Sequence, residues 1–422
     1  MKIVEICEFY SPTGGGVRNY IHQKLEAAAR LGHELTVIAP GAETWIEEKL
    51  GSRIAWVKSP PLPFDKNYRM FWRARDIWRV LDAVSPDVVE ASSPWRAGWI
   101  AANWQGAAAK CLFMHVDPVA VYPHTLLDRI FARDRIDRMF GWFWSYLREL
   151  NGRFDATIVT GGWLARRFES FGLDRIAIAP FGIDRAVFSP DRRSSDLRRE
   201  LLADCGLDED AALLIAVGRH HPEKRLRTII EAVSRAQARR PIGLVVVGDG
   251  FIRHSVERWA ARARHIKVAG HETDQARLAA ILASADALIH GSSAETFGIV
   301  VAEAICSGTP IIVPDAGGSA DLAKASFAEI YRTGDPQSAG DAILRLLARD
   351  LATLSRACIQ EAGANIGRAD GHFESLFGFY ANLAMSRVRK VSSATVFDQI
   401  GAVVGAPFVR ESLAAEYPHL GE

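Results

Sequence analysis

Two glutamates lie on either side of a glycine that can open a helix. In the segment 295–303, Glu295 and Glu303 are separated by seven residues, and Gly298 lies between them. A helix from Gly298 through Ser307 would direct free backbone amides and the positive end of its dipole at a ligand, which suits a diphosphate. The two carboxylates could accept hydrogen bonds from hydroxyl-rich groups, such as a sugar on one side and a ribose on the other. The alternative is an exposed helical glutamate together with an acid that merely stabilises the helix dipole.

Two cations follow an apolar segment that is typical of a strand. In the segment 218–225, Gly218 ends the strand 212–217, and Arg219 and Lys224 lie five positions apart across a turn. Two cations at a strand-to-helix junction can bind a diphosphate and neutralise the charge of a leaving group. The alternative is an ordinary basic loop with an exposed lysine.

A third candidate is the strand-ending turn 248–250, with Gly248 and Gly250 on either side of Asp249. Glycine turns of this kind are common, so this one indicates little by itself.

Two series of alternating strands and helices must position these residues. Strands of the first series are expected at 2–8, 35–39, 53–57, 87–91, 110–115, 156–160 and 176–180. Strands of the second series are expected at 212–217, 243–247, 266–269, 287–290 and 310–313. The alternation predicts an α/β fold of two doubly wound, Rossmann-like domains with parallel sheets, facing a cleft.

Three parts of the chain follow from this pattern. We expect an N-terminal domain at 1–185, a second domain at 186–371, and a C-terminal helix with a tail at 372–422, the helix packing back toward the N-terminal domain. A helical stretch near 68–84 belongs to the first domain. The pattern assigns no structure to 391–422.

Composition excludes several classes of protein. The chain has 422 residues with 49% apolar and 24% charged residues, which is typical of a globular protein of two to three domains. Its net charge of +1 argues against a dedicated nucleic-acid binder. Five scattered cysteines without a CxxC favour reduced thiols in the cytoplasm over a disulfide or zinc framework. Neither a signal peptide nor a membrane-spanning run is predicted, so any membrane contact would be peripheral.

The ordered set of motifs in the second half resembles the donor half of the retaining glycosyltransferases of family four, which have the GT-B architecture. The pieces that match this family in order are Gly218-Arg219, Pro222-Glu223-Lys224, Gly248-Asp249-Gly250, Ala285-Asp286, Glu295-Thr296-Phe297-Gly298 with Glu303, Pro310-Ile311-Ile312-Val313 and Gly317-Gly318. Each piece is weak by itself, but the ordered set is specific. With the N-terminal pieces, the resemblance covers most of the chain.

The N-terminal half resembles the same family in four places, one of which is Ser85–Glu90, similar to the strand that precedes the family's acceptor-side loops. The loop Gly14-Gly15-Gly16 before Val17 is similar to the family's first loop, which approaches the donor diphosphate and the acceptor. His115 resembles the histidine that lies beside the donor sugar. Phe181 stands where Asn is common in the family, which puts one hydrogen bond in doubt.

The resemblance implies transfer of a sugar from a nucleotide diphosphate sugar, with retention of configuration and without a metal or other cofactor. Arg219 and Lys224 are expected to stabilise charge on the leaving diphosphate, and His115 to orient the sugar. Glu295 is expected to bind sugar hydroxyls together with the amides of Phe297, Gly298 and Ile299, and Glu303 to bind the ribose. The donor-binding set is completed by Gly15, Gly16, Gly218, Gly248 and Gly250.

The acceptor half is rich in tryptophan and arginine. Ten of the 11 tryptophans lie between Trp45 and Trp163, and the segments 69–79 and 129–148 combine aromatic residues with arginines. This pattern is typical of a membrane surface, but it also fits aromatic residues that pack a core beside exposed arginines. The acceptor is therefore expected to be a glycan, a lipid-linked molecule or a small molecule. The location is expected to be cytoplasmic, at the inner face of the membrane if the contact exists.

Two other functions fit parts of the pattern. One is a nucleotide-sugar epimerase or a phosphorylase of the same architecture, although no cofactor lysine stands out. The other is a catalytically silent nucleotide-sugar-binding or scaffold protein. The presence of both cations and both glutamates weighs against the second.

Overall fold

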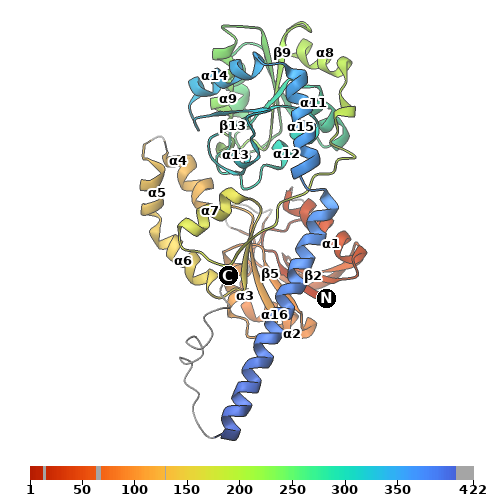
Figure 1. The fold of residues 1–422 in the computed structure, drawn as a ribbon, viewed down its shortest axis with the longest axis vertical. Helices are drawn as coiled ribbons and strands as arrows, with labels where there is room; N and C mark the ends of the chain where they lie inside the picture. Colours follow the sequence, from red (N-terminus) through yellow and green to blue (C-terminus); the bar gives the residue numbers. More distant parts are fainter. Residues whose placement is uncertain (13–15, 63–67, 129, 405–422) are drawn as a thin grey trace, which may run out of the picture.

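The protein consists of two α/β units stacked along the long axis of the molecule (Figure 1). The computed structural model describes residues 1–404 except 13–15, 63–67 and 129, with the side chains of 388–404 left out. Among the predicted site residues, Gly15 lies outside the described residues, as do Gly14 and Arg129. The predicted fold class, two parallel-sheet α/β units, is confirmed.

The first unit is built on an eight-stranded sheet of order β3-β4-β2-β1-β5-β6-β7-β8. Its strands are β1 (Lys2–Ile6), β2 (Glu34–Gly41), β3 (Trp45–Lys49), β4 (Ser52–Lys58), β5 (Val88–Ala91), β6 (Ala109–Met114), β7 (Ala156–Val159) and β8 (Ile176–Ile178). Its helices are α1 (Gly16–Arg30), α2 (Ala74–Val84), α3 (Arg96–Asn103), the π-helical turn η1 (Ala120–His124), α4 (Thr125–Leu127), α5 (Arg133–Met139), α6 (Gly141–Asn151) and α7 (Gly162–Ser170).

The second unit is built on a six-stranded parallel sheet of order β11-β10-β9-β12-β13-β14. Its strands are β9 (Ala212–Val217), β10 (Ile242–Val247), β11 (Ile266–Gly270), β12 (Ala287–Ile289), β13 (Ile311–Pro314) and β14 (Ala328–Tyr331). The helical elements are η2 (Pro190–Arg192), α8 (Ser195–Asp204), η3 (Pro222–Lys224), α9 (Leu226–Ala236), α10 (Arg253–Ala260), α11 (Gln275–Ser284), α12 (Ile299–Cys306), α13 (Gly318–Leu322), α14 (Pro336–Leu347), α15 (Leu351–Asn365) and α16 (Ala369–Val404).

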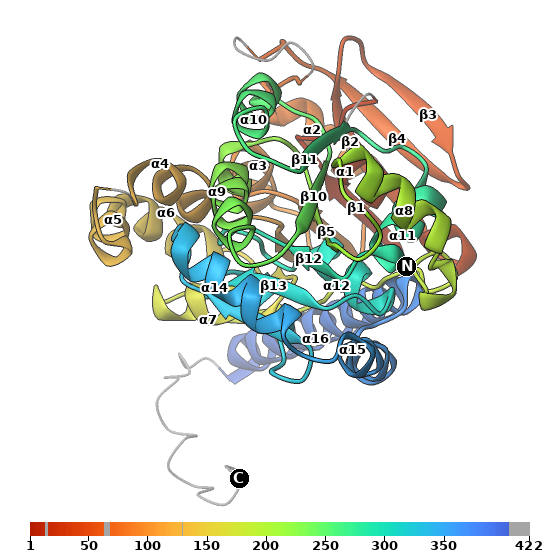
Figure 2. The same ribbon diagram turned by 90° about the horizontal axis from the view of Figure 1, so that it is seen from above.

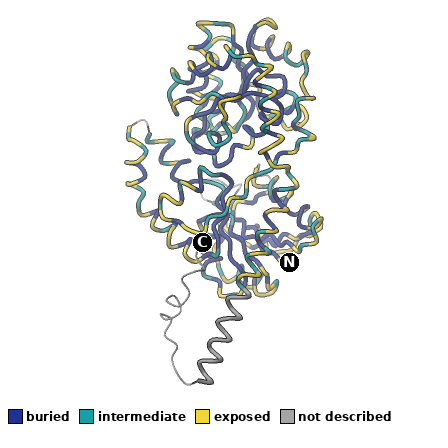
Figure 3. Tube along the Cα trace, in the orientation of Figure 1, coloured by how far each residue is buried: buried dark blue, intermediate teal, exposed yellow. Residues whose placement is uncertain are grey.

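Both sheets are buried on both faces, which explains why their central strands are continuous apolar runs. All six residues of β10 are buried, and buried segments follow the strands through both units (Figure 3). In the second unit, α9, α10 and α14 cover one face of the sheet, while α8, α11 and α12 cover the other (Figure 2). All five cysteines are buried and free.

The C-terminal helix α16 returns to the first unit, as expected. Phe373, Phe377 and Tyr380 pack into the core beneath α1. Further along the helix, Arg387 Nη1 forms an ion pair with Asp155 Oδ1 at 2.8 Å. The helix therefore starts beside the second unit and is anchored on the first.

Three elements differ from the sequence-based expectation. The helix expected near 68–84 begins only at Ala74, because Arg69 instead forms an isolated antiparallel bridge with Pro61. The strands β3 and β14 had no predicted counterpart. The antiparallel β3 lies at the sheet edge and alternates exposed and half-buried residues, so it lacks the buried apolar run that marks the other strands.

Candidate active site

A cavity of about 1000 Å³ lies between the two units at the carboxyl ends of their strands. Its lining comes from both units and from the start of α16. Five of the predicted site residues contribute to it: Gly16, His115, Arg219, Ile299 and Glu303. The position agrees with the rule that open α/β sheets bind ligands at this edge.

The helix α12 points its N-terminus at this cavity. Gly298 precedes it with φ +90, a left-handed conformation that glycine adopts without the strain of a Cβ. No side chain caps the helix, so its first amides remain available for a ligand. This start of the helix corresponds to the one expected from the sequence, and Ile299 lies on it.

Glu303 lies one turn into α12, where it lines the cavity. Within the described part of the chain, its carboxyl group has neither a hydrogen bond nor an ion pair. Burial raises the pKa of Glu303 to about 7. An unpartnered acceptor at this position can receive hydrogen bonds from ligand hydroxyls.

Lys224 and Glu295 pair with each other rather than lining the cavity. Lys224 Nζ lies 2.5 Å from Glu295 Oε2, and the two side chains are 17% and 22% exposed. The buried His290 approaches the same oxygen at 3.5 Å. Burial would raise the pKa of Glu295, but Lys224 and His290 outweigh it and hold this pKa well below its ordinary value. Glu295 is thus a hydrogen-bond acceptor, not a proton donor.

Arg219 is more exposed than this pair. Its side chain is 71% exposed and lines the cavity. Its guanidinium Nη2 lies 3.8 Å from Glu223 Oε1, and Lys224 Nζ lies 3.8 Å from the same oxygen. Sequence reasoning assigned no role to Glu223. Its position in the Pro-Glu-Lys turn was the available signal, because a carboxylate between two cations can orient both side chains.

His115 is held in an aromatic stack. Its ring lies parallel to Phe113 with centroids 4.2 Å apart, and to Phe181 with centroids 6.4 Å apart. Burial, with Lys24 and His372 nearby, lowers the pKa of His115 to about 3. The imidazole is therefore neutral at ordinary pH. Phe181, which departs from the common Asn, supplies a ring face here instead of an amide.

The helix α16 also contributes to the site, which sequence reasoning missed. Ala369, Asp370 and Phe373 line the cavity. His372 Nδ1 lies 2.8 Å from the carbonyl oxygen of Pro180, and its Nε2 lies 3.1 Å from Tyr20 Oη. No local pattern marks these residues, because their partners are far away along the chain.

The glycine turns of the second unit do not line the cavity. Gly248 has φ +139, and a Cβ there would lie 2.0 Å from the carbonyl oxygen of Gly218. A Cβ at Gly250 would lie 2.8 Å from the carbonyl oxygen of His220. Their observed role is close packing of the loops that follow β9 and β10. Phe297, also predicted to bind the donor, is buried edge-on against Phe181 with ring centroids 5.7 Å apart.

The described residues contain neither a cluster that could bind a metal ion nor a helix that could span a membrane. Within the described ranges, no group of three or more His, Cys, Asp or Glu side chains could hold a metal ion. Across the same residues, no helix has the length and apolar character needed to cross a membrane.

Comparison with known proteins assigns both units to one family. The profile described as "Glycosyltransferase Family 4" matches residues 14–187, and that described as "Glycosyl transferases group 1" matches residues 198–364. A GDP-mannose-dependent alpha-mannosyltransferase of Mycolicibacterium smegmatis is 30% identical over 76% of this chain and 82% of its own length.

Two further comparisons agree. A GDP-mannose-dependent alpha-(1-6)-phosphatidylinositol dimannoside mannosyltransferase of Mycobacterium tuberculosis is 27% identical over 79% of this chain and 87% of its own length. The structure of sucrose-phosphate synthase from Thermosynechococcus elongatus has a similar fold, with a TM-score of 0.72 and 18% identity over 91% of this chain and 99% of that one. The chain belongs to the family-four glycosyltransferases of GT-B architecture and transfers a sugar from a nucleotide-sugar donor.

Proposed function

We propose that the protein transfers mannose from GDP-mannose, with retention and without a metal ion, to a hydroxyl group of a lipid-linked acceptor at a membrane surface. The observation that supports it most is the shared cavity, where Arg219 and Glu303 of one unit face His115 of the other. The donor follows from the relatives, two of which are named for GDP-mannose.

The donor diphosphate would bind between Arg219 and the free amides at the start of α12. In transfer, the bond from the anomeric carbon to the diphosphate oxygen breaks, and the acceptor oxygen bonds to that carbon. The electron pair of the broken bond stays on the diphosphate oxygen of GDP, and Arg219 and Lys224 would stabilise this negative charge. The proton of the acceptor hydroxyl passes to the departing phosphate or to solvent. Two cations and a helix dipole can thereby do what a divalent ion does elsewhere.

The sugar and the ribose would bind to separate carboxylates. Glu295 stays ionised beside Lys224, so it would accept hydrogen bonds from mannose hydroxyls. Glu303 would accept hydrogen bonds from the ribose. His115 would face the sugar as a neutral ring, because burial lowers its pKa to about 3.

A surface that we call the aromatic–arginine face supports a lipid-linked acceptor. Its exposed members are Trp72, Trp99, Met139, Trp142 and Arg138, and the half-buried Arg96 lies among them. Arg96 donates to the carbonyl oxygen of Trp72 at 2.9 Å and lies 4.7 Å from the ring centroid of Trp99. The elements that carry the face are neighbours, since α3 contacts both α2 and α6. Exposed aromatic rings beside cations favour an anionic membrane surface.

The same region also contains aromatic residues that pack the core. Phe143 and Trp144 of α6 are buried, and Trp144 stacks on Phe171 with centroids 3.9 Å apart. The adjoining Trp142 is 68% exposed. The segment 129–148 therefore contains rings of both kinds that the two alternatives describe. One set of rings packs in the core, and the other lies on the surface.

The proposal is tested by binding and turnover of the purified protein. A thermal-shift series over nucleotide sugars should show the largest rise in Tm with GDP-mannose, because a ligand that binds only the folded state stabilises it. Release of GDP in the presence of a mannosylated lipid, with and without EDTA, should follow. Loss of turnover with EDTA would contradict the metal-free part, and a larger Tm shift with a uridine or adenosine donor would contradict the choice of base.

A further inference from the structure

An ion pair joins the two units beside the cation that was predicted from the sequence. Arg225 Nη2, directly after Lys224, lies 2.5 Å from Asp128 Oδ2 of the first unit. The two side chains are 10% and 12% exposed, so solvent screens this pair far less than a surface pair. Asp128 follows α4, between the π-helical turn η1 and α5.

Arg225 has an unfavourable backbone conformation that its neighbours must stabilise. Arg225 has φ 47 and ψ 37, a left-handed conformation that is unfavourable for a residue with a side chain. It separates η3, which ends at Lys224, from α9. The carbonyl oxygen of Lys224 lies so close to Gly291 that a Cβ there would be 2.3 Å from it. The direction of the Lys224 side chain therefore depends on this strained junction.

A second contact from the same segment reaches the loop of Glu295. Arg133 Nη2 donates to Ser293 Oγ at 3.0 Å, two residues before Glu295. Nearby, Thr296 Oγ1 donates to the carbonyl oxygen of His115 at 3.0 Å. Asp128 and Arg133 thus contact the two loops that carry the Lys224–Glu295 pair.

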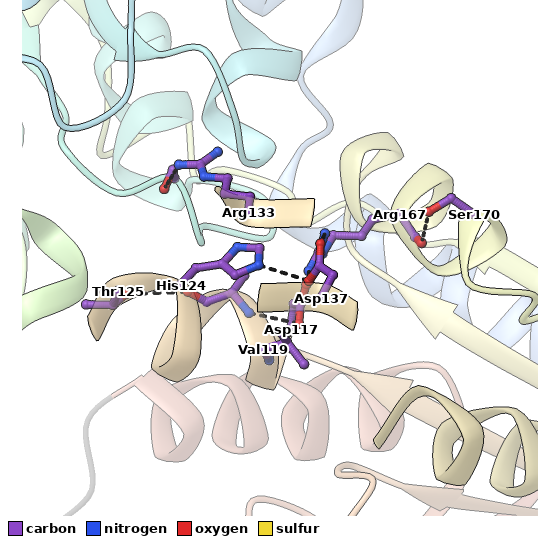
Figure 4. A network of polar contacts seen from close by, with 10 residues as sticks. Asp117, Val119, His124, Thr125, Arg133, Asp137, Arg167 and Ser170 are labelled. Carbon is purple, nitrogen blue, oxygen red and sulfur yellow. Dashed lines mark hydrogen bonds and ion pairs between the residues drawn. The ribbon is translucent and has the colours of Figure 1, made fainter. Parts of the chain in front are cut away.

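The base of this segment is itself fixed by a charged network (Figure 4). Asp117 accepts hydrogen bonds from the amides of Val119 and Ala120 at 2.8 and 3.1 Å, and Arg167 binds its other oxygen. Arg167 Nη2 also lies 2.8 Å from Asp137 Oδ1, which His124 Nε2 approaches at 2.9 Å. A segment fixed in this way can hold its contacts with the other unit in place.

We infer that Asp128 is a positioning residue for sugar transfer: through Arg225 it holds Lys224 in place against Glu295. The inference rests on the proposed roles of Lys224 and Glu295 in the donor site. It implies that a group of the acceptor unit completes the charge arrangement of the donor unit. Arg219, Glu303 and the amides at the start of α12 would bind GDP itself, and within the described residues no hydrogen bond or ion pair joins them to Asp128 or Arg225.

The first test separates positioning from binding. In Asp128→Asn, kcat for GDP release from GDP-mannose should fall about tenfold or more, because small displacements of a reacting group are costly. The dissociation constant for GDP should change less than twofold. The matched control is Asp134→Asn, which removes an exposed acid of α5 and should leave both constants unchanged.

The second test addresses the strained backbone. Glycine adopts the left-handed conformation readily, so Arg225→Gly should retain more of kcat than Arg225→Ala. Asp128→Asn should have no further effect in either background, because its partner is already absent.

The outcomes that oppose the inference can be told apart from failure of the proposed function. The inference alone is overturned if the wild-type protein turns over a nucleotide sugar and Asp128→Asn keeps kcat within twofold. It is also overturned if GDP affinity and Tm fall together with kcat, which would indicate a structural role. A wild-type protein that turns over no nucleotide sugar would overturn the proposed function and the inference together.

Discussion

Lys224 Nζ lies 2.5 Å from Glu295 Oε2, so two residues that are 71 positions apart form one charged pair. Each stabilises the ionised form of the other: burial lowers the pKa of Lys224, but Glu295 and Glu223 outweigh it and raise this pKa above its ordinary value.

Lys224→Ala should lower kcat for GDP release by about 100-fold, because it removes a preorganised positive charge from the leaving diphosphate. The matched control is Lys267→Ala on β11, whose side chain is 44% exposed and pairs with Asp204 at 3.3 Å. The measurement is steady-state turnover of GDP-mannose by the two variants. A loss of less than threefold in Lys224→Ala would show that this lysine does not contact the leaving group.

Glu303→Ala should weaken GDP-mannose binding by about 10- to 100-fold, as expected for hydrogen bonds to a charged acceptor. Isothermal titration of the folded variant measures the effect. Glu303→Gln should lose less, because the amide oxygen still accepts. Unchanged donor affinity in Glu303→Ala would remove this residue from the ribose site.

Glu303 should also produce a pH-dependent stability difference. Its pKa is about 7 in the folded protein, above the ordinary glutamate value near 4.5. Between these two values the folded state holds the proton and the unfolded state does not, so the free energy of unfolding falls as the pH rises through this range. Glu303→Gln abolishes this loss. Without ligand, its Tm should exceed that of the wild type at pH 8 and match it near pH 4.5; equal Tm values at pH 8 would contradict the burial effect.

Binding to anionic vesicles should depend on the aromatic–arginine face. Trp142→Ser together with Trp72→Ser should lower the partition coefficient in a sedimentation assay by about tenfold, because both rings are more than 60% exposed (68% and 64%). Phe251→Ser serves as the matched control, since this ring is 92% exposed but belongs to the donor unit. Equal loss in the control would indicate nonspecific adsorption, and no loss in the double variant would rule out contact through this face.

A buried network under the cavity should be important for stability. Lys24 Nζ lies 2.8 Å from Glu5 and 2.6 Å from Glu90, and all three side chains are fully buried. Tyr380 of α16 donates to the same oxygen of Glu90. Lys24→Met leaves two buried carboxylates without their cation, and it should lower the free energy of unfolding by about 3 kcal/mol.

Equilibrium urea unfolding measures that loss. Arg30→Met lies on the same helix and breaks only ion pairs to Asp370 and Glu374, in which every side chain is 47% exposed or more. It should cost less than about 1 kcal/mol. If both variants lose the same amount, the buried network has no special role.

Much of the second unit could be predicted from the sequence because its signals are local. The buried strands β9, β10 and β13 are continuous apolar runs, and Gly298 marks the start of α12. Arg219 and Glu303 were identified from short motifs, and both line the cavity. The glycines 218, 248 and 250 were also recognised, but the structure shows them in loop packing, not at the cavity wall.

The remaining features depend on contacts between distant parts of the chain. Asp128 meets Arg225 across 97 positions, and Tyr20 meets His372 across 352. A single aspartate beside a short helix has no local sequence pattern that predicts such a distant partner. The π-helical turn η1 likewise could not be predicted from the sequence. Its conformation depends on contacts between Asp117, Asp137 and Arg167, which are far apart along the chain.

The sequence by itself determined the fold class and the family, and it supplied candidates for the donor site, because periodic burial and ordered motifs depend on neighbouring positions. Only the tertiary structure decided how the acceptor unit completes that site. Packing of the two units brings Asp128 to Arg225. The return of α16 to the first unit brings His372 to Tyr20, and the packing of α6 within that unit buries Trp144 and leaves Trp142 exposed. These outcomes depend on how surfaces formed by remote segments fit together, a property that no local stretch of residues contains.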